Sequence, residues 1–163
     1  MNHLVGTLAL GLGATLLVDL WAIARKRIFG IPQPDYGLVG RWFAHVARGR
    51  FLHESIATSA AVRGERLIGW IAHYVVGVLF AALFLAACGV AWLREPTIGP
   101  ALVVGVGTVA APFLLMQPGM GAGVAASRTP RPSAARLQSV ITHTIFGLGL
   151  YASGWVARLF DQS

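Results

Sequence analysis

Two histidines of this chain lie in matching sequence contexts. Residues 66–77 read RLIGWIAHYVVG, and residues 136–147 read RLQSVITHTIFG, so five residue types recur at the same spacing. Both stretches begin long apolar segments, and His73 and His143 occupy the same position in each. An imidazole is costly to place inside a membrane, and it can carry a proton or bind a metal. The repeat therefore points to a functional site.

Each of the four apolar segments carries one polar residue near the same depth. At about 1.5 Å per residue, His73 lies roughly 10 Å inside the boundary marked by Arg66, and His143 lies equally deep. Asp19 and Gln117 fall at a similar level in the first and third segments. We predict that these four side chains line one site for a small ligand or an ion, used in transport or sensing.

Several interpretations of this polar cluster stay open, and they leave open whether the chain is an enzyme. Asp19 could simply accept hydrogen bonds from the histidines and join the helices. Asp19, His73 and His143 could instead be metal ligands, or the two histidines could hold haem, in a membrane redox protein or enzyme. They could also form a proton relay. A last alternative is a structural or accessory subunit with a second copy or another membrane protein as partner.

The composition indicates a membrane protein. The 163 residues are 56% hydrophobic and 12% charged, whereas soluble domains carry roughly 25% charged residues. A span needs about 20 residues, and four apolar segments are that long. We expect an all-α chain with a single domain over residues 1–163. Its transmembrane helices should lie at about 4–24, 67–93, 98–116 and 137–156. The repeat predicts that they form two parallel-repeat hairpins.

The cationic residues are distributed very unevenly. Eleven of the 13 Lys and Arg residues lie between the first and second segments or between the third and fourth, and the other two lie on the opposite side. The positive-inside rule then places both loops in the cytoplasm and both termini in the periplasm of an inner membrane. This topology accounts for the net charge of +7. We expect anionic lipid headgroups as partners and no nucleic acid.

The two long loops carry further candidate residues. Asp35 can cap a short helix whose apolar face includes Trp42, which predicts a helix in the membrane interface or a packed lid. We interpret His45 and His53 as solvated, although a loop that folds back would bring His53 and its neighbour Glu54 to the polar cluster.

The second loop is rich in glycine and contains Arg128, which could hold a lipid phosphate or an anionic substrate. In the third segment, Pro112 predicts a kink.

Short motifs at the ends of the apolar segments carry a family resemblance. They read DLW at 19–21, FGIP at 29–32, GRW at 40–42, HES at 53–55, GER at 64–66, MQPGMG at 116–121, AASRTP at 125–130 and FGLGLY at 146–151. Together they resemble a bacterial family of small inner-membrane proteins known as domain of unknown function 2938. The resemblance covers nearly the whole chain and is most specific over residues 116–130. It implies a bacterial inner-membrane protein and no particular activity.

The charge distribution makes a testable prediction about topology. Alkaline phosphatase, which is active only in the periplasm, is expected to be active when fused after residue 163 and inactive when inserted at residue 130. The physical reason is the excess of cations that holds both loops in the cytoplasm. Activity assays on intact cells check this, with immunoblots to confirm that both fusions are expressed. If only the fusion at residue 130 were active, the orientation would be the opposite of the one predicted.

Overall fold

The computed structural model describes residues 3–161, which form helices, turns and loops without a strand. The elements in chain order are α1 (His3–Phe29), α2 (Tyr36–Val46), η1 (Ile56–Thr58), α3 (Glu65–Cys88), η2 (Val90–Leu93), α4 (Ile98–Gly107), η3 (Pro112–Met116), α5 (Gln117–Gly119), η4 (Val124–Ala126) and α6 (Pro132–Asp161). Four helices are long and apolar enough to cross a membrane: His3–Phe29, Glu65–Cys88, Ile98–Gly119 and Pro132–Phe160. The all-α class and the four candidate spans are thus confirmed.

The second and third spans differ from the sequence prediction at positions where glycine or proline interrupts the helix. The second span was predicted to continue to residue 93, but α3 ends at Cys88. The next residue, Gly89, has a φ of 78°, a conformation that glycine adopts easily and that ends a helix. In the third span, α4 ends at Gly107, and residues 112–116 form a π-helical turn. Pro112 has no amide hydrogen, so the regular hydrogen-bond ladder is interrupted there.

Contacts within the chain divide it into two compact units, which we describe separately. Unit 1 comprises Met1–Gln33, Tyr74–Thr108 and Ile141–Ser163, and unit 2 comprises Pro34–His73 and Val109–Val140. Unit 1 holds α1, α4 and most of α3 and α6. Its core is aliphatic and aromatic, and the largest fully buried side chains in the described part are Phe84, Leu10, Leu150 and Thr15.

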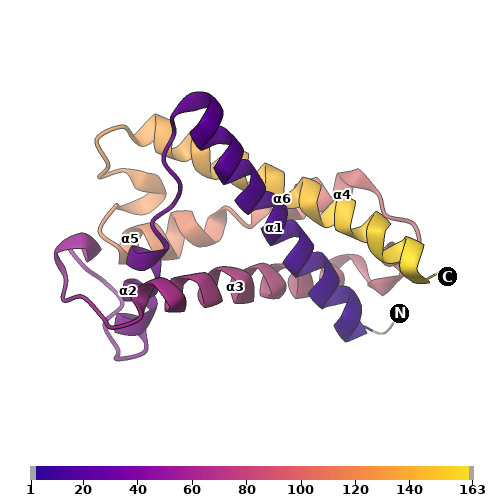
Figure 1. Ribbon diagram of the computed structural model, residues 1–163, viewed down its shortest axis with the longest axis horizontal. Coiled ribbons are helices and arrows are strands. Elements are labelled where there is room, and N and C mark those ends of the chain that lie inside the picture. The colour runs from indigo at the N-terminus through magenta and orange to yellow at the C-terminus, as the bar shows by residue number, and fades with distance from the viewer. Residues whose placement is uncertain (1–2, 162–163) are drawn as a thin grey trace. The chain divides into compact units, whose positions relative to one another are not determined.

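Glycines let the helices of unit 1 approach closely. A Cβ atom added to Gly11 on α1 would strike the backbone of α3 at Val78. One added to Gly149 on α6 would strike the backbone of α1 at Ala14, where the two helices cross in Figure 1. Gly105 on α4 lies equally close to α6. Such close backbone contact is how helices gain packing energy in lipid, where burial of apolar surface gives little.

The glycine that ends each copy of the repeat has the same structural role. Gly77 on α3 faces Thr15 of α1, and Gly147 on α6 faces Ala101 of α4. Each copy therefore packs against the candidate span that precedes it. The arrangement as two parallel-repeat hairpins and the duplication both stay predictions.

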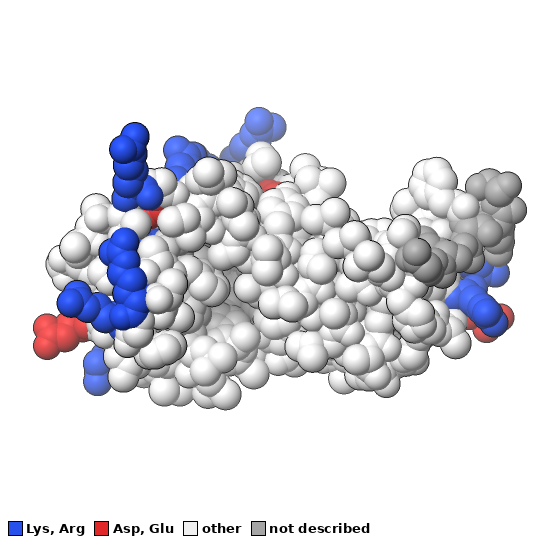
Figure 2. Space-filling view, turned by 90° about the horizontal axis from the view of Figure 1, so that it is seen from below, with Lys and Arg blue, Asp and Glu red and all other residues white. Residues whose placement is uncertain are grey.

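The outer surface of the candidate spans is apolar. Large side chains such as Leu16, Leu79, Leu83 and Val103 are more than half exposed. On the face drawn in Figure 2, the Lys and Arg side chains leave a broad surface of uncharged residues. Exposed leucines in such numbers are unfavourable in water and suit contact with lipid chains.

Unit 2 joins the two long loops. Asp35 caps α2 as predicted, because its Oδ1 atom accepts hydrogen bonds from the amides of residues 37 and 38 at 2.8 and 3.4 Å. Gly40 on α2 lies against the backbone of Glu65 and Gly69, at the start of α3. This contact packs α2 against the start of α3. The two alternatives for α2, an interfacial helix and a lid over the bundle, both stay predictions.

Two glycines on α4 offer a matched test of this packing. Gly105→Ala is expected to destabilise the protein by about 1–3 kcal/mol, because the added methyl group overlaps the Gly147 backbone. Gly107→Ala should change stability by no more than about 0.5 kcal/mol, because no heavy atom lies within 4 Å of the added Cβ. Thermal unfolding of both variants in detergent measures the difference. Equal stability of the two would contradict the helix contact.

Candidate functional site

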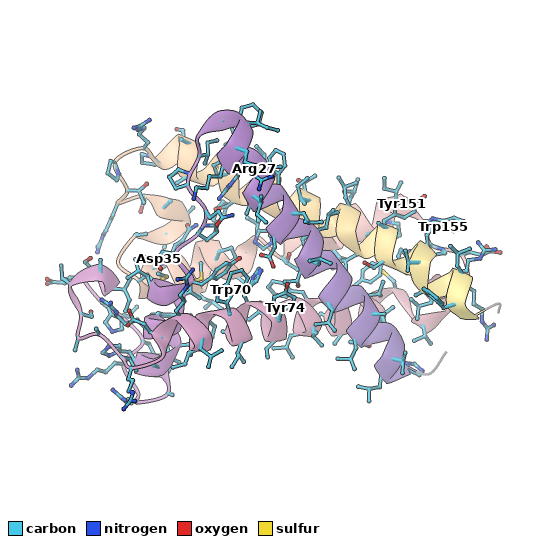
Figure 3. All side chains as sticks on the ribbon, in the orientation of Figure 1. Arg27, Asp35, Trp70, Tyr74, Tyr151 and Trp155 are labelled. Atoms are coloured by element: carbon cyan, nitrogen blue, oxygen red, sulfur yellow. The ribbon has the colours of Figure 1, made fainter. Side chains whose placement is uncertain are left out.

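The predicted intramembrane carboxylate in unit 1 has a hydroxyl partner. Tyr74 on α3 donates a hydrogen bond of 2.8 Å to Oδ2 of Asp19 on α1. Tyr74 is labelled in Figure 3. A hydrogen bond to an ionised acceptor is about twice as strong as one between neutral groups. Sequence reasoning missed Tyr74, although it directly follows His73 and was the only phenol within that span.

His143, also in unit 1, is bonded to a threonine. Its Nδ1 atom lies 2.7 Å from Oγ1 of Thr108, which immediately follows α4. The Thr108 hydroxyl also donates to the carbonyl of Gly105. A hydroxyl has one proton to donate, so the hydrogen between Thr108 and His143 belongs to the ring. The neutral imidazole is thus protonated at Nδ1, and its Nε2 atom holds a lone pair that can accept a proton.

His73, in unit 2, lies in an aromatic cluster. Its Nε2 atom is 3.0 Å from the hydroxyl of Tyr36, the first residue of α2. The rings of Tyr36 and Trp70 pack at a centroid distance of 4.2 Å, and those of Tyr36 and His73 at 4.6 Å. These contacts fix the position of the imidazole. Tyr36 was not predicted, because no sequence pattern relates it to α3.

Gln117 and Arg128 also belong to unit 2. The Gln117 amide donates to Oγ of Ser139 at 3.3 Å. Its Oε1 atom is buried and has no hydrogen-bond partner among the described residues. Arg128 is exposed after η4, where its charge is accessible to an anion. Gln117 thus offers a buried acceptor, and Arg128 offers an exposed cation.

The structure therefore gives a hydrogen-bond partner to each of the four residues that we predicted to line the site. Asp19 and His143 have theirs in unit 1, and His73 and Gln117 have theirs in unit 2. That the four side chains line one site stays a prediction. Within residues 3–161, no group of three or more His, Cys, Asp and Glu side chains could hold a metal ion.

Arg41 on α2 is the centre of a polar network in unit 2. Its guanidinium binds both carboxylate oxygens of Glu65, each at 2.8 Å. It also donates to three backbone carbonyls of the first loop, those of Ile56, Ala57 and Ser59. The hydrogen bonds to Glu65 raise the pKa of Arg41 above its usual value. One side chain thus joins α2, η1 and the first turn of α3.

The two loops of unit 2 are bonded to each other. The amides of His53 and Ile56 donate to the carbonyls of Gly119 and Met120, both at 3.0 Å. A Cβ on Gly121 would overlap the carbonyl of Glu54. The first loop therefore folds against the second one.

This contact corrects our interpretation of His45 and His53 as solvated residues. His45 is only 4% exposed, and its Nε2 atom lies 3.0 Å from the carbonyl of Ala60. His53 is partly buried, and its Nδ1 atom lies 3.1 Å from the carbonyl of Gly119. The helical pattern placed His45 on a polar face, but that face packs against the loop rather than facing water.

The second loop holds an unusual backbone conformation. Ala125 and Ala126 have positive φ values of 47° and 59°, which cost roughly 1–2 kcal/mol each for a residue with a Cβ. The guanidinium of Arg136 donates to the carbonyl of Ala125 at 2.8 Å and holds this turn. The repeated arginine thus has a structural partner in the second copy.

Comparison with known proteins gives a family without an activity. The chain matches the family described as "Protein of unknown function (DUF2938)" over residues 8–157. This match covers most of the chain, so the chain belongs to that family. No curated protein and no solved structure matches it. Function must therefore be argued from the residues themselves.

The Arg41 network predicts how unit 2 responds to substitution. Arg41→Lys is expected to lower the melting temperature and to speed hydrogen exchange of residues 56–65. The single ammonium group of lysine cannot replace a planar guanidinium that donates to a carboxylate and to three carbonyls. Hydrogen–deuterium exchange mass spectrometry in detergent measures the effect, with Arg48→Lys, an exposed arginine of the same loop, as the matched control. Equal exchange in both variants would contradict the role of Arg41.

Proposed function

We propose that this DUF2938 protein carries an intramembrane protonation site centred on the Asp19–Tyr74 pair. In this proposal, binding and release of a proton by Asp19 is coupled to the transport or sensing of a small polar ligand or ion. The single observation that carries the proposal is the 2.8 Å hydrogen bond between Tyr74 and Asp19, two residues of different candidate spans.

Magnitudes favour a functional reason for this carboxylate. A charged aspartate at the centre of a membrane helix costs at least about 2.5 kcal/mol. A hydrogen bond between membrane helices contributes about 0.6 kcal/mol on average. A bond of that size does not offset the cost of the charge. Joining helices is therefore a weak reason to place Asp19 there, whereas binding a proton or an ion requires such a group.

His143, also in unit 1, supports the same proposal. Its Nε2 atom holds a lone pair, because Nδ1 donates to Thr108. This lone pair can accept a proton or a hydrogen bond from a ligand. We propose that Asp19 and His143 both take part in proton binding.

The remaining parts of the proposal concern location. We place the protein in a bacterial inner membrane, with both termini in the periplasm and anionic lipids at the cytoplasmic face. The support is the uneven distribution of 11 cations against two across the candidate spans.

Proton flux tests the protonation site. In liposomes that contain a pH-sensitive dye, the wild-type protein is expected to dissipate an imposed pH gradient faster than empty liposomes do. Asp19→Asn should lower the rate to that of empty liposomes, because an amide cannot exchange a proton. Asp35→Asn is the matched control, since asparagine caps a helix as well as aspartate does and should keep the wild-type rate.

Two outcomes would contradict the proposal. One is a wild-type rate in the Asp19→Asn protein. The other is a visible haem absorption band, or a bound metal that is lost in His73→Ala, in the purified protein. That second result would favour the redox alternative.

A further inference from the structure

A second candidate site lies in the first loop, within unit 2, and does not depend on the proposed protonation site. There, a groove of about 560 Å³ is lined by residues of one short stretch, which include His45, Arg50, Phe51, Leu52, His53 and Ser59. Pockets for small molecules typically have volumes of about 300–1,000 Å³ and place a few polar groups among apolar ones. The groove fits this description.

Each of the two histidines in the groove has one nitrogen that is already bonded and one that is not. Nε2 of His45 and Nδ1 of His53 lie at hydrogen-bond distance from backbone carbonyls, at 3.0 and 3.1 Å. A carbonyl can only accept, so these two nitrogens carry the hydrogens and the neutral rings hold lone pairs on the opposite atoms. Those atoms, Nδ1 of His45 and Nε2 of His53, are buried and have no partner among the described residues.

A buried acceptor without a donor is destabilising, so these atoms call for a donor from outside the chain. The two rings are close, with centroids 5.0 Å apart. His45 is only 4% exposed, so the residues around it hold its side chain in place. One ligand with two neighbouring hydroxyl groups could therefore donate to both rings.

Arg50 adds a positive charge to the same groove. Its amide donates to the carbonyl of His45 at 3.0 Å, which fixes the backbone, while its side chain is exposed. No ion pair joins its guanidinium to another residue of the described part. A guanidinium binds phosphate through two parallel hydrogen bonds. The cation therefore favours an anionic group at the mouth of the groove.

The residues after Arg50 point to the membrane as the source of this anion. Phe51 and Leu52 are 59% and 78% exposed at the edge of the groove. Large apolar side chains next to an arginine are typical of segments that lie at the boundary between headgroups and acyl chains.

We propose that this groove binds a hydroxyl-bearing phosphate ester, as found in the phosphatidylglycerol headgroup. The phosphate pairs with Arg50, and the glycerol hydroxyls donate to the free nitrogens of His45 and His53. Phe51 and Leu52 contact the acyl chains.

A metal ion is less well suited to the groove than this ligand. The two imidazoles alone give two ligands, and no group of three or more metal-binding side chains occurs within residues 3–161. Arg50 would also repel a cation. Nitrogen acceptors beside a guanidinium match a ligand that is both anionic and a hydrogen-bond donor.

Calorimetry on the purified full-length protein in a neutral detergent tests the proposal with three probes. They are short-chain phosphatidylglycerol, short-chain phosphatidylcholine and glycerol phosphate. Phosphatidylglycerol is expected to bind, and phosphatidylcholine, which has no headgroup hydroxyl, is expected to bind at least about tenfold more weakly. Comparable binding of glycerol phosphate and phosphatidylglycerol would support the same chemistry with a soluble ligand as its source.

Three variants separate the groove from general charge effects. Arg50→Gln is expected to weaken phosphatidylglycerol binding by about tenfold or more, because a charge-assisted bond is lost. Arg48→Gln is the matched control, because this neighbouring exposed arginine does not line the groove and its loss should change binding less than about twofold. His53→Asn retains an amide donor near the position of Nδ1 but removes Nε2, so it should weaken phosphatidylglycerol more than phosphatidylcholine.

The overturning results are equally specific. Equal losses in Arg50→Gln and Arg48→Gln would show attraction by net charge rather than a site. Equal affinity for phosphatidylglycerol and phosphatidylcholine, or no binding of any probe, would also refute the proposal. Circular dichroism and gel filtration confirm that each variant is folded. If Arg50→Gln does not fold, the His53→Asn comparison decides alone.

Discussion

Polar groups inside a hydrocarbon layer must find their partners within the protein, and this constraint governs the candidate spans of this chain. There is no water to satisfy them, and an ionised group left alone is costly. The Asp19 carboxylate accepts from Tyr74, and the His143 ring donates to Thr108, which itself donates to the Gly105 carbonyl. The glycine contacts serve the same constraint, because they bring backbones close enough for short side chains to bond.

In unit 2 the same need is met by one arginine and by backbone carbonyls. Arg41 binds Glu65 and three carbonyls of the first loop, so these acceptors in and after η1 have a donor. Backbone bonds from His53 and Ile56 to the second loop complete the arrangement. Nearly all buried polar atoms in proteins have partners. In unit 2, Nδ1 of His45, Nε2 of His53 and Oε1 of Gln117 have none among the described residues, and the two histidines line the same groove. These unpaired nitrogens make the groove a candidate ligand site.

The sequence predicted those features that depend on composition and on local residue types. Apolar length predicted four candidate spans, and Asp35 before apolar residues at helical spacing predicted the cap of α2. It did not predict the end of α3 at Cys88, because the apolar run continues past Gly89 and hydropathy does not register a change of φ. It identified Asp19 and His143 as notable but missed Tyr74 and Thr108. Their roles depend on how neighbouring helices are rotated, which spacing along one helix does not specify.

The interpretation of His45 was wrong for a related reason. A helical pattern separates a polar face from an apolar face, and we assigned the polar face to water. In the structure, that face carries Arg41 and His45 and packs against a loop whose exposed carbonyls need donors. A polar face is buried when the surface opposite it is made of backbone. A sequence pattern that classifies only side chains cannot show this.

The repeat shows how two copies of one motif can differ in their contacts. His73 and His143 hold equivalent positions, and the glycine four residues after each one contacts the preceding candidate span. Yet His73 bonds to a phenol of α2, while His143 bonds to a threonine next to α4. The first loop supplies α2, and the second loop, with its glycines and short turns, has no counterpart of that length. The glycine contact is therefore common to both copies, whereas the histidine partner differs, being a residue of the first loop for His73 and a residue next to α4 for His143. A functional symmetry between the two histidines does not follow from their shared sequence context.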